Sequence, residues 1–186
     1  MVSLIMNFFK GVLGYLGLYN KKANLLFLGL DNAGKSTLLY MLKTDKMTQT
    51  KPTLHPHSEE LKLGNIKFNT YDLGGHETAR KIWKEYFPAV DGILFLVDAA
   101  DAKRFPEAKL ELENVLNTPE LAKIPLSILG NKIDRSEAVR EDELKEALDL
   151  NTLIAKSDRP MELFMCSVSK KVGYANAFNW ISNYLK

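Results

Sequence analysis

A glycine-rich loop with the spacing of a phosphate-binding motif occupies residues 29–36 of this 186-residue chain. Its sequence, GLDNAGKS, matches G-x-x-x-x-G-K-[ST], and apolar runs lie before it at 25–28 and after it at 37–42. A strand before the loop and a helix after it are the setting in which this motif binds nucleoside triphosphates. The glycines let backbone N–H groups approach the phosphates, and the helix N-terminus adds partial positive charge. We therefore predict a nucleoside triphosphate site.

Lys35 and Ser36 would have separate roles in such a loop. The Lys35 ammonium would reach the β- and γ-phosphate oxygens, and the Ser36 hydroxyl would bind Mg²⁺. Asp31 is close enough to approach the water shell of the metal, although a turn residue that bonds its own backbone is an equally good interpretation. The residues that we expect to bind nucleotide in this loop are Asp31, Asn32, Ala33, Gly34, Lys35, Ser36 and Thr37.

A second motif, N-K-I-D at 131–134, ends the apolar run at 124–129. It would lie at the carboxyl end of a strand, where open α/β sheets bind ligands. The Asp134 carboxylate can accept hydrogen bonds from both N1–H and the 2-amino group of guanine, and adenine offers no such pair. Lys132 would lie along the base and ribose, and Asn131 would connect this loop to the phosphate loop. Combined with the phosphate loop, the motif predicts GTP as substrate and GDP as product.

Three positions between these motifs could act on the metal and the γ-phosphate. Asp72 ends a run that alternates as a strand does, and it could hold Mg²⁺ directly or through water. Thr53 lies in a loop and could be a second hydroxyl ligand of Mg²⁺ while the γ-phosphate is bound. Gly75 can offer an unhindered backbone N–H to a γ-phosphate oxygen. Loops 44–57 and 73–80 are therefore the segments that we expect a γ-phosphate to order.

Five segments resemble, in this order, the secretion-associated Ras-related (Sar) GTPases, close relatives of the ADP-ribosylation-factor GTPases. They are GLDNAGKS, PTLHPxSEEL, DLGGHE, LGNKIDR and MELFMCSV, and the resemblance spans essentially the whole chain. It implies an α/β fold of the P-loop NTPase class, a Ras-like mixed six-stranded sheet with helices on both faces. It also implies nucleotide contacts from Ser167 and Val168 in the last segment and from Ser169 directly after it.

The catalytic candidate is His76. Phosphoryl transfer to water needs a residue that positions the nucleophile in line with the γ-phosphate. His76 could do so through a ring nitrogen, and the resemblance favours this role over that of an exposed loop histidine. No arginine precedes Arg80 in either presumed switch loop. We therefore expect slow GTP hydrolysis without an activating protein that supplies an arginine.

Departures from the family pattern occur at Lys51, at His57 and in the stretch 149–160, which looks shorter than in most members. None of them lies in the nucleotide site. The first puts the docking of its own loop in doubt, and contacts usually made by the shortened stretch could be missing.

The resemblance also implies a function. It describes a GTPase switch whose GTP form recruits a COPII-like vesicle coat for transport from the endoplasmic reticulum to the Golgi apparatus. Its partners would be a membrane, a guanine-nucleotide exchange factor and a GTPase-activating coat subunit. It would be cytoplasmic and would bind reversibly to the cytosolic face of endoplasmic reticulum and Golgi membranes. The alternative is a membrane-associated GTP-binding scaffold of the ADP-ribosylation-factor-like group with little or no turnover.

Alternating strands and helices would have to position these motifs. Alternation of this kind favours a largely parallel sheet with helices on both faces. Only two residues join the strand at 58–63 to the next one, so this strand should be antiparallel to its neighbour. The expected strands are 23–29, 58–63, 66–72, 91–98, 124–130 and 161–166. The expected helices are 35–43, 78–87, 105–116, 140–149 and 174–185.

Residues 1–19 form a separate apolar segment before a GTP-binding domain at 20–186. A transmembrane span needs about 20 apolar residues, and the run at 4–19 is shorter than this. The run also contains the charged residue Lys10. It also lacks the basic start and the small-residue cleavage site of a signal peptide. Val2 stands where myristoylation needs glycine. We expect an amphipathic helix that inserts into the membrane interface.

The composition of the chain limits the classes of function that remain. The single cysteine, Cys166, excludes an internal disulfide and fits a reducing cytosol. It ends an apolar run, so we expect a core thiol, with a reactive cysteine as the alternative. The formal net charge of +2 is too small to argue for a nucleic-acid partner, and we expect none.

Overall fold

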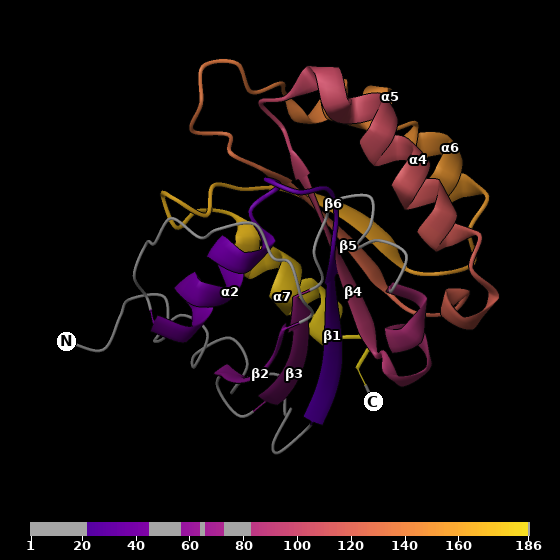
Figure 1. Ribbon diagram of the computed structural model, residues 1–186. Helices are drawn as coiled ribbons and strands as arrows, with labels where there is room; N and C mark the ends of the chain where they lie inside the picture. Colours follow the sequence, from indigo (N-terminus) through magenta and orange to yellow (C-terminus); the bar gives the residue numbers. More distant parts are fainter. Residues whose placement is uncertain (1–21, 45–56, 64–65, 73–82, 186) are drawn as a thin grey trace.

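The computed structural model describes residues 22–44, 57–63, 66–72 and 83–185. These residues build a six-stranded sheet with helices on both faces, in the strand order β2-β3-β1-β4-β5-β6 (Figure 1). The predicted α/β class is confirmed. The strands are β1 (Lys22–Leu28), β2 (His57–Leu63), β3 (Ile66–Asp72), β4 (Gly92–Asp98), β5 (Leu126–Asn131) and β6 (Met161–Met165).

The sheet is mixed because one edge strand runs against the others. β2 pairs with β3 antiparallel. β1 pairs in parallel with both β3 and β4, and β5 pairs in parallel with β4 and β6. The hairpin that the short connection predicts is therefore confirmed. Since all the other strands are parallel, their carboxyl ends lie at one edge of the sheet, which positions the loops described below.

Strands β1, β4 and β5 are buried on both faces. In β1, Leu25–Leu28 are all 0% exposed, as are Ile93–Leu96 in β4. Strands that are covered on both faces appear in a sequence as continuous apolar runs, without the alternation of a half-exposed strand. This is why the apolar runs of the sequence identified them.

Each face of the sheet carries its own helices. On one face lie α2 (Lys35–Thr44) and α7 (Tyr174–Ser182) (Figure 1). Phe178 of α7 packs on Phe27 of β1 with ring centroids 6.3 Å apart. The other face carries α4 (Phe105–Leu116), α5 (Glu141–Ala147) and α6 (Leu150–Ala155). Short 3₁₀ helices η2 (Ala102–Arg104) and η3 (Pro119–Leu121) flank α4.

Two predicted helices are corrected. Of the helix expected at 78–87, residues 78–82 lie outside the described residues. The remainder belongs to a 3₁₀ helix, η1 (Trp83–Ala89), which contains Pro88. The proline ring disfavours the α conformation at the preceding residue, Phe87, and so opposes an α-helix that extends to 87. The helix expected at 140–149 ends early, because Asp149 adopts a left-handed φ of 53° and a separate helix, α6, follows it.

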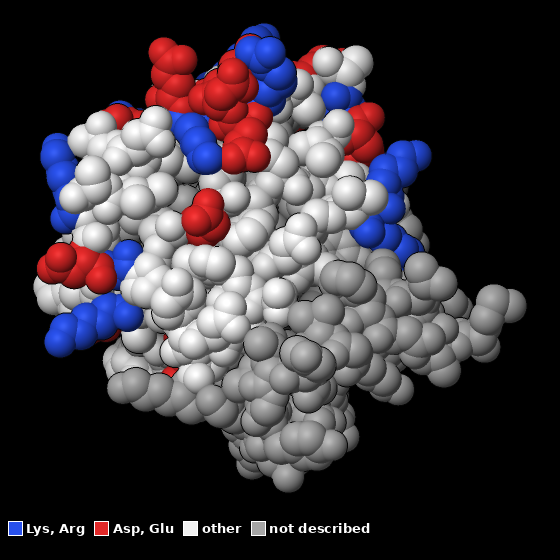
Figure 2. All heavy atoms as spheres, turned by 180° about the vertical axis from the view of Figure 1, so that it is seen from behind, with Lys and Arg blue, Asp and Glu red and all other residues white. Residues whose placement is uncertain are grey.

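The predicted N-terminal membrane segment at 1–19, and with it the predicted domain boundary, lies outside the described residues. Within the ranges that the structure does describe, no helix has the length and hydropathy that crossing a bilayer requires. On the face shown in Figure 2, the lysine, arginine, aspartate and glutamate side chains lie mainly around the margin, with both signs side by side.

Cys166 is the core thiol that the sequence predicts. It is 0% exposed. Burial raises the pKa of its thiol to about 12, which keeps the sulfur protonated and unreactive at neutral pH.

Candidate nucleotide-binding site

The carboxyl ends of β1, β5 and β6 bring the sequence motifs together at one edge of the sheet. The sheet that carries these strands is shown in Figure 1. The phosphate loop follows β1, Asn131 is the last residue of β5, and Ser167 comes soon after the end of β6. Parallel strands end at the same edge, so segments far apart in the sequence become neighbours there. This edge is where open α/β sheets bind ligands.

Two glycines shape the phosphate loop. Gly29 has φ +123°, and a Cβ at this position would meet the Leu96 carbonyl oxygen at 2.1 Å. Gly34 has φ +103°, and a Cβ there would meet the Asn131 side-chain nitrogen at 2.4 Å. Between them, Asn32 is left-handed at φ 62°, a region that asparagine enters more readily than most residues. The loop is thus a tight turn whose shape requires this sequence.

The ammonium of Lys35 lies inside the curve of the loop. Lys35 is 5% exposed, and its Nζ donates to the carbonyl oxygens of Gly29 at 2.8 Å and Leu30 at 2.9 Å. Ser36 and Thr37 follow in the first turn of α2, both partly buried. The phosphate loop thus places a buried cation at the N-terminus of α2, an arrangement suited to an anion such as a phosphate.

Asn131 connects the base loop to the phosphate loop. It is 3% exposed, and its Nδ2 donates to the Ala33 carbonyl oxygen at 2.9 Å. Its Oδ1 accepts from the Val168 backbone N–H at 3.1 Å and from the Cys166 thiol at 3.8 Å. The connection that the sequence predicts is confirmed, and the same side chain also fixes the segment after β6.

Asp134 is held by two hydroxyl groups of that segment. Ser167 Oγ donates to Asp134 Oδ1 at 2.6 Å, and Ser169 Oγ donates to Oδ2 at 2.9 Å. The hydrogen bond from Ser167 is the largest cause that lowers the pKa of the Asp134 carboxyl below its usual value. Asp134 is exposed, so its remaining lone pairs are open to a ligand. An ionised carboxylate in a fixed orientation is the acceptor that guanine recognition needs.

Lys132 pairs with Asp98, a residue that the sequence motifs do not identify. Lys132 Nζ lies 2.6 Å from Asp98 Oδ2, and the Ala100 backbone N–H donates to Asp98 Oδ1 at 3.1 Å. Asp98 ends β4, the strand beside β5. Asp98 is an acidic residue that directly follows a buried apolar run, and this position could have indicated a residue of the site. The pair orients the stem of Lys132 at the edge where we expect the base to bind.

A second missed residue, Arg104, contacts the phosphate loop. Its Nη2 lies 2.7 Å from Asp31 Oδ1. The hydrogen bond from Arg104 is the largest cause that lowers the pKa of Asp31, and the hydrogen bond to Asp31 is the largest cause that raises the pKa of Arg104. The Asp31 carboxylate, expected near a metal, is therefore already paired in part. No motif in the sequence includes Arg104.

The oxygen groups predicted for Mg²⁺ lie only partly within the described residues. The hydroxyl of Thr53 lies outside them, as do Gly75 and His76, which were predicted for the γ-phosphate and the attacking water. Asp72 ends β3, and for this strand the structure describes the backbone alone. The register pairs Asp72 with Phe27, two residues before Gly29, so its backbone lies beside the phosphate loop. The described residues contain no group of three or more His, Cys, Asp or Glu that could hold a metal. Hydroxyl and carboxylate oxygens are nevertheless the donors that Mg²⁺ prefers, and a loop hydroxyl beside a strand-end aspartate fits it.

Comparison with known proteins agrees with this geometry. A family model described as the ADP-ribosylation factor family matches residues 9–185. A Giardia intestinalis protein named Small COPII coat GTPase SAR1 is 46% identical over 187 residues, covering 96% of this chain and 98% of that protein. A Nicotiana tabacum protein of the same name is 41% identical, covering 98% of this chain and 99% of that protein. The solved structure of the Arl6 BBS3 small GTPase from Trypanosoma brucei, with bound nucleotide analogue GppNp, has a TM-score of 0.80 and 28% identity, covering 88% of this chain and 96% of that chain.

Proposed function

This chain belongs to the ADP-ribosylation factor family and is a small GTPase, and we propose that its GTP form attaches to a membrane and recruits a vesicle coat. Two relatives that are 46% and 41% identical carry the name Small COPII coat GTPase SAR1, and both align over nearly their full lengths. Their name supports a COPII-type coat and transport from the endoplasmic reticulum to the Golgi apparatus. The switch would be set by whether GTP or GDP is bound.

The observation that supports guanine-nucleotide binding, on which the switch depends, is the junction of the two nucleotide loops. The 2.9 Å bond from Asn131 to Ala33 joins the phosphate loop to the loop that ends in Asp134. One end of a nucleotide would lie over the backbone N–H groups of residues 31–37, with Lys35 turning toward the phosphates. The other end would reach the Asp134 carboxylate, which accepts from guanine N1–H and the 2-amino group. Ser167, Val168 and Ser169 hold that carboxylate and its loop in place.

Four residues would hold Mg²⁺. Ser36 and Thr53 would supply hydroxyl oxygens, Asp72 a carboxylate, and Asp31 a second carboxylate toward the water shell. Bound Mg²⁺ would offset the negative charge on the β- and γ-phosphate oxygens. Gly75 would donate its backbone N–H to a γ-phosphate oxygen, so this contact and that of Thr53 would be made with GTP and lost with GDP.

His76 would position the water that attacks the γ-phosphate, accepting a hydrogen bond from it through a ring nitrogen. The loops 44–57 and 73–79 contain no arginine. Hydrolysis would therefore be slow until an activating coat subunit supplies one in trans, and a separate exchange factor would load GTP. One partner would thus promote the exchange of GDP for GTP, and a different partner would promote the hydrolysis of GTP to GDP.

Turnover of GTP tests the proposal. The substitution His76→Gly should leave GTP affinity unchanged, because the ring would face the attacking water and leave the bound phosphates alone. Hydrolysis stimulated by a membrane-coat extract should fall at least roughly tenfold, a cautious estimate for a positioned catalytic group. Retained turnover with weakened GTP binding would make His76 a binding residue. Absence of turnover in the wild-type chain with the extract would favour a GTP-binding scaffold.

A further inference from the structure

We propose that Arg104 is a positioning residue for guanine nucleotides, because it holds the phosphate loop in its binding shape through Asp31. The inference rests on the proposed function, since it assigns a further residue to the same site. Arg104 is the last residue of η2 and the N-cap of α4, so it belongs to neither nucleotide loop. It reaches the phosphate loop from a helix 73 positions further along the chain.

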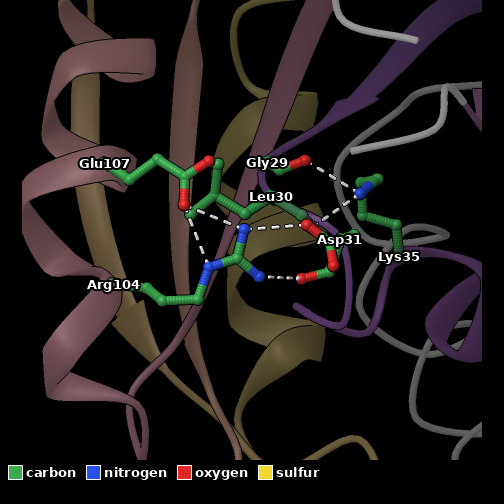
Figure 3. Close-up of polar contacts among 6 residues, drawn as sticks. All are labelled: Gly29, Leu30, Asp31, Lys35, Arg104 and Glu107. Carbon is green, nitrogen blue, oxygen red and sulfur yellow. Dashed lines mark hydrogen bonds and ion pairs between the residues drawn. The ribbon is translucent and has the colours of Figure 1, made fainter. Parts of the chain in front are cut away.

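Arg104 holds Asp31 at two points (Figure 3). Its Nη2 donates to Asp31 Oδ1 at 2.7 Å, and its Nη1 donates to the Asp31 main-chain oxygen at 3.1 Å. The first bond fixes the side-chain rotamer. The second fixes the plane of the peptide that joins Asp31 to Asn32. One guanidinium therefore sets both the carboxylate and the backbone at this point of the loop.

The peptide that Arg104 holds is next to the strained part of the loop. Asn32 is left-handed at φ 62°, a conformation that is uncommon for residues other than glycine. Rotation of the preceding peptide would let Asn32 relax to negative φ and would turn the backbone N–H groups that follow. Because strained conformations persist only where the surroundings enforce them, the bond to the Asp31 oxygen opposes this relaxation.

Lys35 and Arg104 both bind carbonyl oxygens of the phosphate loop. Three successive carbonyl oxygens, those of Gly29, Leu30 and Asp31, each accept a hydrogen bond from one of these two cations (Figure 3). A bound phosphate would draw the Lys35 ammonium away from its two carbonyl partners. Arg104 lies on the other side of Asp31 and can keep its bonds, so the loop retains its shape while Lys35 turns to the phosphate.

Glu107 anchors the guanidinium from the opposite side. Its Oε2 accepts from Arg104 Nε at 3.0 Å and from Nη2 at 2.9 Å, one turn along α4. The planar guanidinium can bridge both acidic residues and the main-chain oxygen, which a single ammonium cannot. Behind the pair, Phe105 and Ala108 are 6% and 2% exposed, so α4 offers a rigid support.

The expected effect of Arg104 on nucleotide release depends on how exposed the Arg104–Asp31 ion pair is. The Arg104 and Asp31 side chains are 30% and 42% exposed, so solvent screens the ion pair in part. Charge-assisted bonds at a half-exposed site are therefore expected to change nucleotide release several-fold and to leave the fold intact.

The rate at which a fluorescent GDP analogue leaves the full-length chain tests the inference. Arg104→Met, which keeps the stem and removes every donor, should accelerate release roughly three- to tenfold. Arg104→Lys should fall between this variant and the wild type, because it can serve only part of the contacts. Release from Arg104→Met within about twofold of the wild-type rate would overturn the inference.

Two matched controls separate loop positioning from a local effect on the helix. Glu107→Gln removes the anchor on α4 and leaves the Asp31 contacts in place. Arg140→Met alters an arginine that is also an N-cap and also pairs with a glutamate three residues on, at the start of α5. Glu107→Gln weakens only the support of Arg104, so it should accelerate release less than Arg104→Met does, and Arg140→Met should keep release within about twofold of wild type. Acceleration by Glu107→Gln equal to that of Arg104→Met would overturn the inference in favour of a helix-capping role.

A double-mutant cycle identifies Asp31 as the intermediary. Because Arg104 acts through both the carboxylate and the main-chain oxygen of Asp31, the acceleration of GDP release by Arg104→Met should be smaller in the Asp31→Ala background than in the wild-type chain, and the bond to the main-chain oxygen should account for what remains. Effects that multiply would overturn the inference, since additive contributions indicate independent action. Failure of the wild-type chain to bind the GDP analogue would overturn the proposed function itself, whereas normal binding with unaltered release in Arg104→Met contradicts this inference alone.

Discussion

Asn131 serves two segments with one side-chain amide, donating to Ala33 in the phosphate loop and accepting from Val168 after β6. At this scale the residue types of the site could be predicted, because guanine and phosphate require particular donors and acceptors. The ionic partners Asp98 and Arg104 could not be predicted in the same way. An ion pair depends on which strand ends become neighbours, and the motifs carry no information about that.

Asp134 is the residue on which base selection depends. Asp134→Asn replaces two acceptor oxygens by one acceptor and one donor, so GTP affinity should fall by the equivalent of roughly 1.5–3 kcal/mol. The affinity for xanthosine triphosphate should rise, because xanthine carries an acceptor where guanine has its amine. Equilibrium titration with both nucleotides measures this. GTP affinity within a factor of about two of wild type would contradict the assignment.

Cys166 gives a prediction about reactivity. The usual pKa of 9.0 is raised to about 12 by burial, so the thiolate fraction near neutral pH should be about a thousandfold lower in the folded chain. Iodoacetamide at pH 8 should therefore label the urea-unfolded chain far faster than the native chain, followed by mass spectrometry. Equal rates would show an accessible, reactive thiol.

At the scale of elements, buried strands and long amphipathic helices were predictable because burial on both faces or on one stripe leaves a periodic pattern. The elements that escaped prediction depend on single residues. Asp149 turns left-handed and separates α5 from α6, and Pro88 lies within the 3₁₀ helix η1. A pattern averaged over a turn or more does not detect a break made by one residue.

Gly173 is such a position, and it controls the entry to α7. It has φ +85°, and a Cβ there would meet the Met165 carbonyl oxygen at 2.2 Å. Gly173→Ala should lower the free energy of unfolding by at least about 1–2 kcal/mol in urea titration, because alanine is disfavoured at this φ and meets rigid backbone. Asn176→Ala, an exposed substitution in the same helix, is the control and should change it by less than about 0.5 kcal/mol. Equal effects would contradict the backbone argument.

At the scale of the whole molecule, nucleotide can move a membrane segment only through different affinities for two arrangements of the chain. Thr53 and Gly75 would supply that difference, because both need the γ-phosphate. The resemblance suggests that the hairpin of β2 and β3 slides along the sheet and takes the place of residues 1–19. β2 is an edge strand with one neighbour, which suits such a shift.

Linkage makes this coupling reciprocal. If GTP increases membrane affinity by some factor relative to GDP, membranes must tighten GTP relative to GDP by the same factor. A chain shortened to residues 20–186 should bind nucleotide normally and lose both effects, since side chains of the N-terminal segment would provide the membrane contacts.

Liposome flotation of the full-length chain, with GDP in one sample and a non-hydrolysable GTP analogue in the other, tests the switch most directly. The account predicts that the GTP analogue raises the floated fraction well above that with GDP, and that residues 20–186 stay in solution with either nucleotide. Equal flotation of the full-length chain with both nucleotides would contradict the account, because the N-terminal segment would then be a constitutive anchor on a GTP-binding protein.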